Sequence, residues 1–238
     1  MRLAAAKIFS FVSFDFCSCF ITILFSKWNK DIVAQIIDKN KKTLLYAAVA
    51  IIVIIAGFFL YKNYVIEPRE AKANDLIFKG QEYFAADNYE MALNGDGQGY
   101  LGFLNIADEY SSTKAGNLAN LYAGLSYAKL GKAQEAVNYL EKFDDCGDEI
   151  ISPAAIEALA NCYADLDQVD KATSLLLEAA DRADNNSISP MCLMTAGQLF
   201  ESQGKTEDAL ECYKTIKEKY INSMQYAEID KYIERVSK

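Results

Sequence analysis

The chain has 238 residues, of which 33 are acidic and 24 basic, and it contains no histidine. The absence of histidine excludes Ser-His-Asp and Cys-His catalysis and any zinc site built on imidazole, and no other nucleophile or metal motif is present, so we expect no enzyme, no cofactor and no metal. Residues 62–238 carry 17 Lys and Arg against 30 Asp and Glu, a net charge of −13 that disfavours nucleic acid as a partner.

Residues 8–25 are an apolar run, IFSFVSFDFCSCFITILF, that follows Arg2 and Lys7 and is interrupted by Asp15. An acidic residue in the middle of a membrane-spanning helix costs about 2.5–3.5 kcal/mol. A signal-like segment, a first membrane helix and an upstream extension all fit residues 1–25, and we interpret them as an apolar extension. Residues 26–42 contain five lysines and form a basic juxtamembrane segment.

Residues 43–61, TLLYAAVAIIVIIAGFFLY, contain no charged residue, and a tyrosine lies near each end, Tyr46 and Tyr61. A helix of that length spans about 28 Å, which matches the hydrocarbon core of a bilayer. We therefore expect a transmembrane helix, and the alternative is a buried helix of a soluble protein. The lysines before this helix favour a cytoplasmic amino-terminal side, so we expect a single-pass protein of the cytoplasmic membrane whose large domain lies in the periplasm. The opposite topology, with the domain in the cytosol, remains the alternative.

Residues 62–73 are polar, and we expect a short hinge there. From residue 74 to 238 the apolar residues follow the 3.6-residue period of helices and no strand pattern occurs, so the fold is predicted to be all-α. An internal repeat runs through this domain. A small residue is followed by an aromatic residue after three positions and by alanine after nine more, as in Gly80–Tyr83–Ala92, Gly124–Tyr127–Ala136, Ala160–Tyr163–Ala172 and Gly197–Phe200–Ala209.

The repeat predicts pairs of antiparallel helices. The alanines are 44, 36 and 37 residues apart, and each pair has a turn residue that tolerates positive φ: Asp87, Gly131, Asp167 or Gly204. We expect the small residue to face the alanine, with the aromatic residue filling the wedge between the helices. Ser152-Pro153 and Ser189-Pro190 are predicted to open first helices as N-cap and N1. A last helix with Ile229, Tyr232, Ile233 and Val236 on one face is predicted to cap the stack.

These features resemble the tetratricopeptide repeat family over residues 73–223, in four units. The family's tryptophan-like position holds Leu76, Asn120, Ile156 and Leu193 instead, and its terminal proline is missing. The resemblance implies an α-α superhelix of about four helix-turn-helix repeats with a capping helix. One membrane helix followed by an acidic repeat domain is also similar in architecture to the periplasmic ancillary subunit of the bacterial secretion translocon.

The resemblance further implies a concave binding groove lined by the first helices. The carried-over groove positions that we expect to bind a partner are Asn74, Gln81, Leu121, Leu125, Asn161, Asp165, Met194, Gln198 and Glu201. The other positions in the same rows are Ile77, Phe84, Leu118, Lys129, Glu157 and Met191. Glu157, Asp165 and Glu201 would repel a terminal carboxylate, so we expect basic or apolar helical segments as ligands. The predicted function is a membrane-anchored protein-interaction scaffold or chaperone-like factor of the bacterial cell envelope, and the alternative is a cytosol-facing receptor that collects chaperones or precursor proteins.

Three further features have plain structural interpretations. Residues 94–102, NGDGQGYLG, begin like a calcium loop, but position twelve is Asn105 where the closing Glu is needed, so we interpret them as a glycine-rich kink. The pairs Asp144/Asp145 and Asp148/Glu149 are interpreted as a solvated turn. Cys146, Cys162, Cys192 and Cys212 show no metal spacing, and we expect them to be small buried apolar residues, with one disulfide possible outside the cytoplasm.

Overall fold

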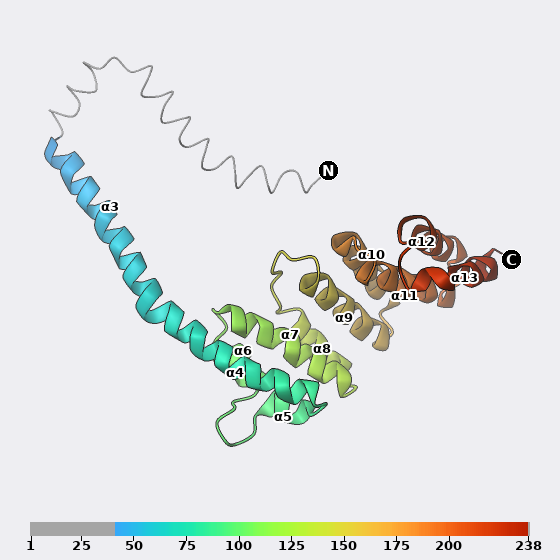
Figure 1. Ribbon diagram of the computed structural model, residues 1–238, viewed down its shortest axis with the longest axis horizontal. Coiled ribbons are helices and arrows are strands. Elements are labelled where there is room, and N and C mark those ends of the chain that lie inside the picture. Colours follow the sequence, from blue (N-terminus) through green and yellow to red (C-terminus); the bar gives the residue numbers. More distant parts are fainter. Residues whose placement is uncertain (1–40, 238) are drawn as a thin grey trace, which may run out of the picture. The chain divides into compact units, whose positions relative to one another are not determined.

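The computed structural model describes residues 41–237, and these residues are helical with no strand among them. The chain divides into two units between Asn63 and Tyr64. The predictions for residues 1–25 and for most of 26–42 lie outside the described residues. In the first unit, α3 (Lys41–Tyr61) covers the predicted membrane helix (Figure 1). Its described side chains are exposed on every side, including Ile54 at 69 % and Phe58 at 61 %.

The residues expected to form a hinge are helical. A π-helix, η1 (Lys62–Ile66), is followed directly by α4 (Glu67–Ala85), which has Pro68 in its first turn. Proline at this position is preorganised for a helix, and Glu, Arg, Ala and Lys are all good helix formers. The carboxylate of Glu70 accepts hydrogen bonds from the backbone N–H of Lys114 and Ala115, at 3.0 and 3.2 Å. From Glu70 onward, the segment is thus bonded to the repeats.

The second unit is a succession of antiparallel helix pairs followed by a closing helix (Figure 1). The first pair consists of α4 and a broken second helix made of α5 (Tyr89–Asn94) and α6 (Phe103–Glu109). The remaining elements are α7 (Lys114–Lys129), α8 (Ala133–Leu140), α9 (Ile151–Asp165), α10 (Val169–Ala183), α11 (Ile188–Ser202), α12 (Thr206–Lys219), η2 (Gln225–Ala227) and α13 (Ile229–Val236). The four predicted helix pairs are confirmed, and the glycine-rich segment 95–102 is the interruption between α5 and α6.

The four turns within the pairs share one backbone conformation, as predicted. Asp87, Gly131, Asp167 and Gly204 have φ of 57°, 71°, 57° and 72°. In each turn the carbonyl of the repeat's aromatic residue accepts a 2.9 Å hydrogen bond from the N–H five positions later, as in Lys205 to Phe200. A second bond joins each turn residue to the carbonyl three positions earlier, as in Gly204 to Glu201 at 2.9 Å. Together these bonds form the Schellman motif, which satisfies the last carbonyls of each first helix.

The small residue of each repeat admits a large side chain of the second helix. A Cβ added at Gly124 would lie 2.5 Å from Cγ of Leu140, and one at Gly197 would overlap the ring of Tyr213. Both partners lie four residues beyond the repeat's alanine. The alanine faces the glycine as predicted in the second pair, where the carbonyl oxygen of Ala136 would lie 3.2 Å from the added Cβ, but the side chain four positions later fills the space. In the first pair the position four beyond Ala92 falls in the loop, and Tyr100 and Phe103 fill the space at Gly80 instead.

The predicted N-caps at Ser152 and Ser189 are wrong, because both serines lie inside the first turn of their helices. The capping is done by acceptors further upstream. Asp148 accepts from the N–H of Ile150 at 2.8 Å, and Asn185 accepts from the N–H of Ser187 and Ile188 at 2.9 Å. The serine hydroxyls instead accept from loop backbone, namely from Cys146 N–H at 3.0 Å and from Asn185 N–H at 3.1 Å.

The predicted capping helix is confirmed as α13. Ile229 is 1 % exposed, and Tyr232, Ile233 and Val236 pack partly buried against the core that contains Tyr213 and Ile216. The polar face carries Asp230, which forms an ion pair with Lys217 of α12 at 2.5 Å. One end of the repeat stack is therefore closed by a helix of the chain itself.

Candidate functional site

The predicted groove residues come from the first helices α4, α7, α9 and α11, and the structure divides them by exposure. Four are exposed: Asn74, Asn161, Asp165 and Gln198. None of these four makes a side-chain hydrogen bond within the described part of the chain. Gln81 and Met194 are half-buried. The four exposed side chains are therefore free to meet a ligand without breaking a hydrogen bond.

The leucines of α7 belong more to the core than to a surface. Leu121 is only 6 % exposed and packs in one cluster with Ala136, Val137 and Leu140, while Leu125 is half-buried against the same cluster. Apolar groove positions in the first repeat behave likewise, since Ile77 is 4 % exposed and Phe84 packs edge-on against Tyr122. The part of the row contributed by α7 is thus closed by internal packing.

Glu201 is held by the capping helix. Its carboxylate accepts hydrogen bonds from the hydroxyl of Tyr213 at 2.5 Å and from the guanidinium of Arg235 at 2.6 Å. Burial acts to raise the pKa of Glu201, but the bonds from Arg235 and Tyr213 outweigh it and leave the pKa lowered. The charge of Glu201 is neutralised by Arg235, so the expected repulsion of a ligand's carboxylate does not come from this residue.

The other acidic groove positions differ from each other. Glu157 is half-buried on α9, and this burial raises the pKa of its carboxyl. Asp165, at the end of the same helix, is exposed. Of the three acidic residues expected to repel a terminal carboxylate, only Asp165 is exposed and has no ion-pair partner among residues 41–237. The groove is therefore less acidic than the sequence suggested.

Met194 contributes to a shallow hollow at the carboxyl-terminal end of the row. The hollow has a volume of about 260 Å³ and is lined by Met194 of α11, Met224, Gln225 and Glu228 around η2, and Tyr232 of α13. Met224 is 90 % exposed. Sequence reasoning missed Met224 because it lies outside the helical repeat, in the connection to the capping helix.

The glycine-rich segment is fixed by one carboxylate. Asp96 accepts hydrogen bonds from Lys79 at 2.5 Å, from the hydroxyl of Tyr83 at 2.9 Å, and from the backbone N–H of Gln98 and Tyr100. The bond from Lys79 and then that from Gln98 hold the pKa of Asp96 well below its usual range. Asp96 therefore ties the loop back to α4, and its oxygens are already used.

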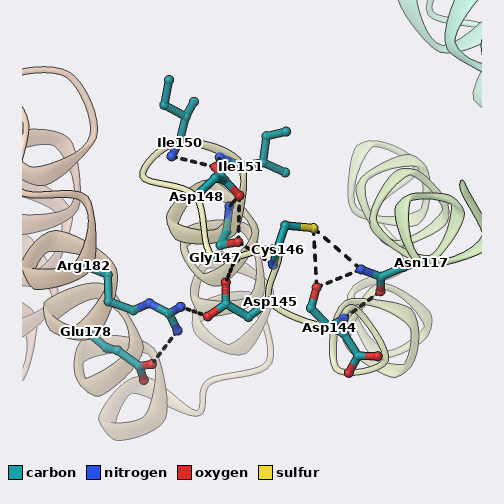
Figure 2. A network of polar contacts seen from close by, with 11 residues as sticks. Asn117, Asp144, Asp145, Cys146, Gly147, Asp148, Ile150, Ile151, Glu178 and Arg182 are labelled. Carbon is teal, nitrogen blue, oxygen red and sulfur yellow. Dashed lines mark hydrogen bonds and ion pairs between the residues drawn. The ribbon is translucent and has the colours of Figure 1, made fainter. Parts of the chain in front are cut away.

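The acidic turn between α8 and α9 is a bonded network (Figure 2). Asp145 pairs with Arg182 of α10, which also reaches Glu178 at 3.5 Å. Asn117 of α7 donates to the carbonyl of Asp144 at 2.8 Å and accepts from its N–H at 2.7 Å. The turn therefore links the second repeat to the third. Among the described residues, no group of three or more acidic or cysteine side chains could hold a metal ion.

The cysteine prediction is confirmed for three residues and wrong for one. Cys162, Cys192 and Cys212 are buried free thiols, and burial raises the pKa of these thiols to about 11, 12 and 11. Cys146 is exposed, because it lies in the polar network of the turn rather than on a helix face. Its sulfur lies 3.8 Å from the side-chain nitrogen of Asn117.

The comparisons agree with the helix pairs. A family model described as a tetratricopeptide repeat-like domain matches residues 36–229. Two crystal structures of Podosopora anserina putative kinesin light chain nearly identical TPR-like repeats, one of a substituted form, are 13 % identical with a TM-score of 0.54, and the match covers 70 % of this chain and 85–86 % of theirs. A crystal structure of MamA is 16 % identical with a TM-score of 0.49, over 66 % of this chain and 92 % of that one. No curated protein matches this chain.

Proposed function

The chain belongs to the tetratricopeptide repeat-like domain family, and from that premise we propose that it is a membrane-anchored scaffold that binds other polypeptides along its first helices. In this proposal the ligand is a basic or apolar helical segment. The scaffold acts in the bacterial cell envelope, with its repeats in the periplasm, where it assists secretion or assembly of other proteins.

The proposed anchor is α3. One helical stretch among the described residues, Val49–Ala85, is long and apolar enough to cross a membrane by its length and composition, and it begins within α3. The apolar side chains of α3 that the structure describes are exposed all round, for example Val53 at 63 % and Phe59 at 56 %, which costs free energy in water and none in lipid. The family match starts at residue 36 and so includes all of α3.

The observation that carries the binding proposal is the exposure of Asn74, Asn161, Asp165 and Gln198 on three different first helices. Amide groups can both donate and accept hydrogen bonds, so they suit the polar edge of a bound peptide. Between them, α7 offers only the half-buried edges of Leu118 and Leu125, because Leu121 belongs to the core. With Glu201 neutralised, Asp165 is the free charge of the row, and it favours a basic ligand.

A photo-crosslinking experiment tests the groove. A photoreactive residue at Asn161 or Gln198 is expected to capture a polypeptide in cells, whereas one at Asn138 of α8 or Lys214 of α12, both exposed on second helices, is not. Replacing Asn74, Asn161, Asp165 and Gln198 together by alanine should abolish capture from a fifth groove position, Met191. Equal capture from first and second helices would overturn the proposal.

Thiol labelling tests the topology. Cys146 is exposed while the other three described cysteines are buried with raised pKa, so a membrane-impermeant maleimide should react with Cys146 first. In a Cys17→Ser, Cys19→Ser variant, labelling of intact spheroplasts is expected if the repeats lie in the periplasm. Labelling only after lysis would mean that they face the cytosol. A matched variant that lacks Cys146 and carries Asn29→Cys reports the other side of the membrane.

A further inference from the structure

In each repeat after the first, the first helix contacts the second helix of the preceding repeat: α7 contacts α6, α9 contacts α8 and α11 contacts α10. Three positions of that first helix, spaced i, i+3 and i+7, are withdrawn from solvent in every one of these repeats. We call these positions the leading face. They are Ala119, Tyr122 and Ser126 in α7, Ala155, Ala158 and Cys162 in α9, and Cys192, Thr195 and Leu199 in α11. All nine are buried or half-buried. Tyr122 shows the contact directly, because its ring stacks on Phe103 at 5.2 Å and meets Phe84 at 5.4 Å, both in the preceding repeat.

Within the part of the chain that the structure describes, nothing covers the leading face of the first repeat. By the repeat intervals its residues on α4 are Asp75, Phe78 and Glu82, and all three are exposed. Phe78 takes the place of Tyr122 and is 63 % exposed. Terminal repeats of a stack carry a polar outer face for solubility, which accounts for Asp75 and Glu82. It does not account for a phenylalanine between them.

The two ends of the stack therefore differ. At the carboxyl-terminal end, α13 covers the last repeat with Ile229 and three partly buried neighbours. At the other end a large aromatic side chain stands where an adjoining second helix packs in every later repeat. The contact between α10 and α11 shows what fits such a face: a helix with small and aliphatic residues on one side, such as Leu176 and Ala179.

The charges define its chemistry. Asp75 and Glu82 lie three positions before and four after Phe78, one helical turn away on either side. The nearby Lys79 is already bonded to Asp96 at 2.5 Å, which leaves Lys72 as the basic group beside them. A second copy of this chain placed there about a twofold axis would bring the carboxylates of Asp75 and Glu82 against their own kind. A basic helix meets complementary charge instead.

We propose that the leading face of α4 binds a basic amphipathic helix of another protein, which receives Phe78 between its aliphatic side chains and pairs its Lys or Arg with Asp75 and Glu82. This surface adjoins the groove, since Asn74 lies one helical turn before Phe78, but it shares no residue with the groove positions, and the inference goes beyond the proposed function. The bound helix takes the position that the second helix of a preceding repeat has elsewhere in the stack, and so extends the stack by one helix.

The test uses a probe peptide taken from the chain itself. The peptide carries the sequence of α10, which covers the leading face of α11 with Leu176, Ala179, Ala180 and Ala183, and it has Lys at positions 170, 178 and 181 in place of the exposed acidic residues. Its affinity is measured by fluorescence anisotropy for the full chain in nanodiscs of neutral lipid. The control peptide keeps the natural Asp170, Glu178 and Asp181.

Phe78→Ala is expected to weaken binding of the basic peptide about tenfold or more, as for a central anchor of an interface. Asp75→Lys with Glu82→Lys should weaken it to a similar extent and remove its salt dependence, and the acidic control peptide should bind more weakly than the basic one. Ile221→Ala, at a residue that is 57 % exposed in the connection to η2, is the matched control and should change nothing. Because Phe78 is exposed, thermal melting of each variant should equal that of the parent chain.

Other outcomes identify other occupants. Affinity that falls with the fourfold groove substitution but not with Phe78→Ala would overturn this inference and leave the groove proposal intact. A dimer in analytical ultracentrifugation that Phe78→Asp dissociates would show a second copy at this face and overturn the inference as well. So would peptide binding that appears only when residues 1–40 are deleted, since the chain's own amino-terminal segment would then be the occupant.

Discussion

Gly131 and Gly204 follow the ends of their helices and have positive φ. Asp87 and Asp167 adopt the same backbone conformation in the other two repeats, although they carry a side chain. No heavy atom lies within 4 Å of a Cβ built at Gly204, so a substitution there meets only the conformational cost of the left-handed region. That cost is about 1–2 kcal/mol for an ordinary L-residue and smaller for Asp, whose side chain can bond locally.

We therefore expect Gly204→Ala to lower the free energy of unfolding by about 1 kcal/mol, and Gly204→Asp to lower it by less. Urea denaturation of the two variants and the parent chain measures both. Since Asp occupies the same turn position in two repeats of this chain, Asp is the matched control. Equal stability of the alanine and aspartate variants would show that positive φ at position 204 causes no backbone strain.

The small positions of the first helices give a second prediction. A Cβ at Gly197 would overlap Tyr213, whose side chain is fully buried and bonded to Glu201, so the ring cannot swing aside. Gly197→Ala should therefore destabilise the chain by about 1–3 kcal/mol, as overpacking does. The control is Gln198→Ala on the exposed side of the same helix.

The third repeat suggests the rescue. It has Ala160 at the small position and Leu176 four beyond its alanine, both fully buried. Adding Tyr213→Leu to Gly197→Ala should restore part of the lost stability, measured as a favourable coupling in a double-mutant cycle. Additive losses would show that Tyr213 is not the group that excludes the methyl.

At the scale of elements, the helix pairs could be predicted because each repeated residue type has a separate physical reason to recur. The ends of the helices could not. Ser152 and Ser189 precede proline and look like caps, but the acceptors that cap these helices, Asp148 and Asn185, lie further upstream in loops without a period. The break between α5 and α6 was visible in the sequence as a glycine-rich insertion. The sequence did not indicate that Tyr100 and Phe103 would fill the space at Gly80.

Asp148 gives the third prediction. Burial acts to raise the pKa of its carboxyl, but bonds from the N–H of Ile150 and Ile151 and from Ser152 outweigh it, so the folded-state pKa is lowered. Its contribution is then fully present above the unfolded-state pKa of about 3.9 and is lost as the pH falls through the lower folded value. Asp148→Ala should cost about 1 kcal/mol at pH 7, the usual worth of a cap.

The same difference should shrink as the pH falls below about 4, because the parent chain loses the bonded carboxylate there. Chemical denaturation at pH 7 and pH 3 measures the change. Asp144→Ala in the same turn is the control, since the hydrogen bonds of Asp144 are made by its backbone. A cost that is independent of pH would mean that the charge of Asp148 does not stabilise α9.

At the scale of the whole molecule, the all-helical repeat fold was predictable because it depends on local period and spacing. The candidate groove was predictable only in part. Leu121 looked available by position but is core, and Glu201 looked free but is bonded to Arg235, 34 positions away on α13. Neither outcome follows from the repeat, because both depend on how one element packs against another.

The capping helix gives the last prediction, since a repeat stack is stabilised by contacts between neighbours. Ile229 is 1 % exposed, and Ile229→Ala should cost about 2–5 kcal/mol, as for a fully buried aliphatic residue. The loss should fall on α11 and α12, which contact α13 or share its core cluster, and should spare α4 and α7, whose core cluster is a different one. Native-state hydrogen exchange of the full chain is expected to show faster exchange in the fourth repeat and unchanged rates in the first two. A uniform rise across all four repeats would mean that the stack unfolds as one cooperative unit and that α13 stabilises the whole chain.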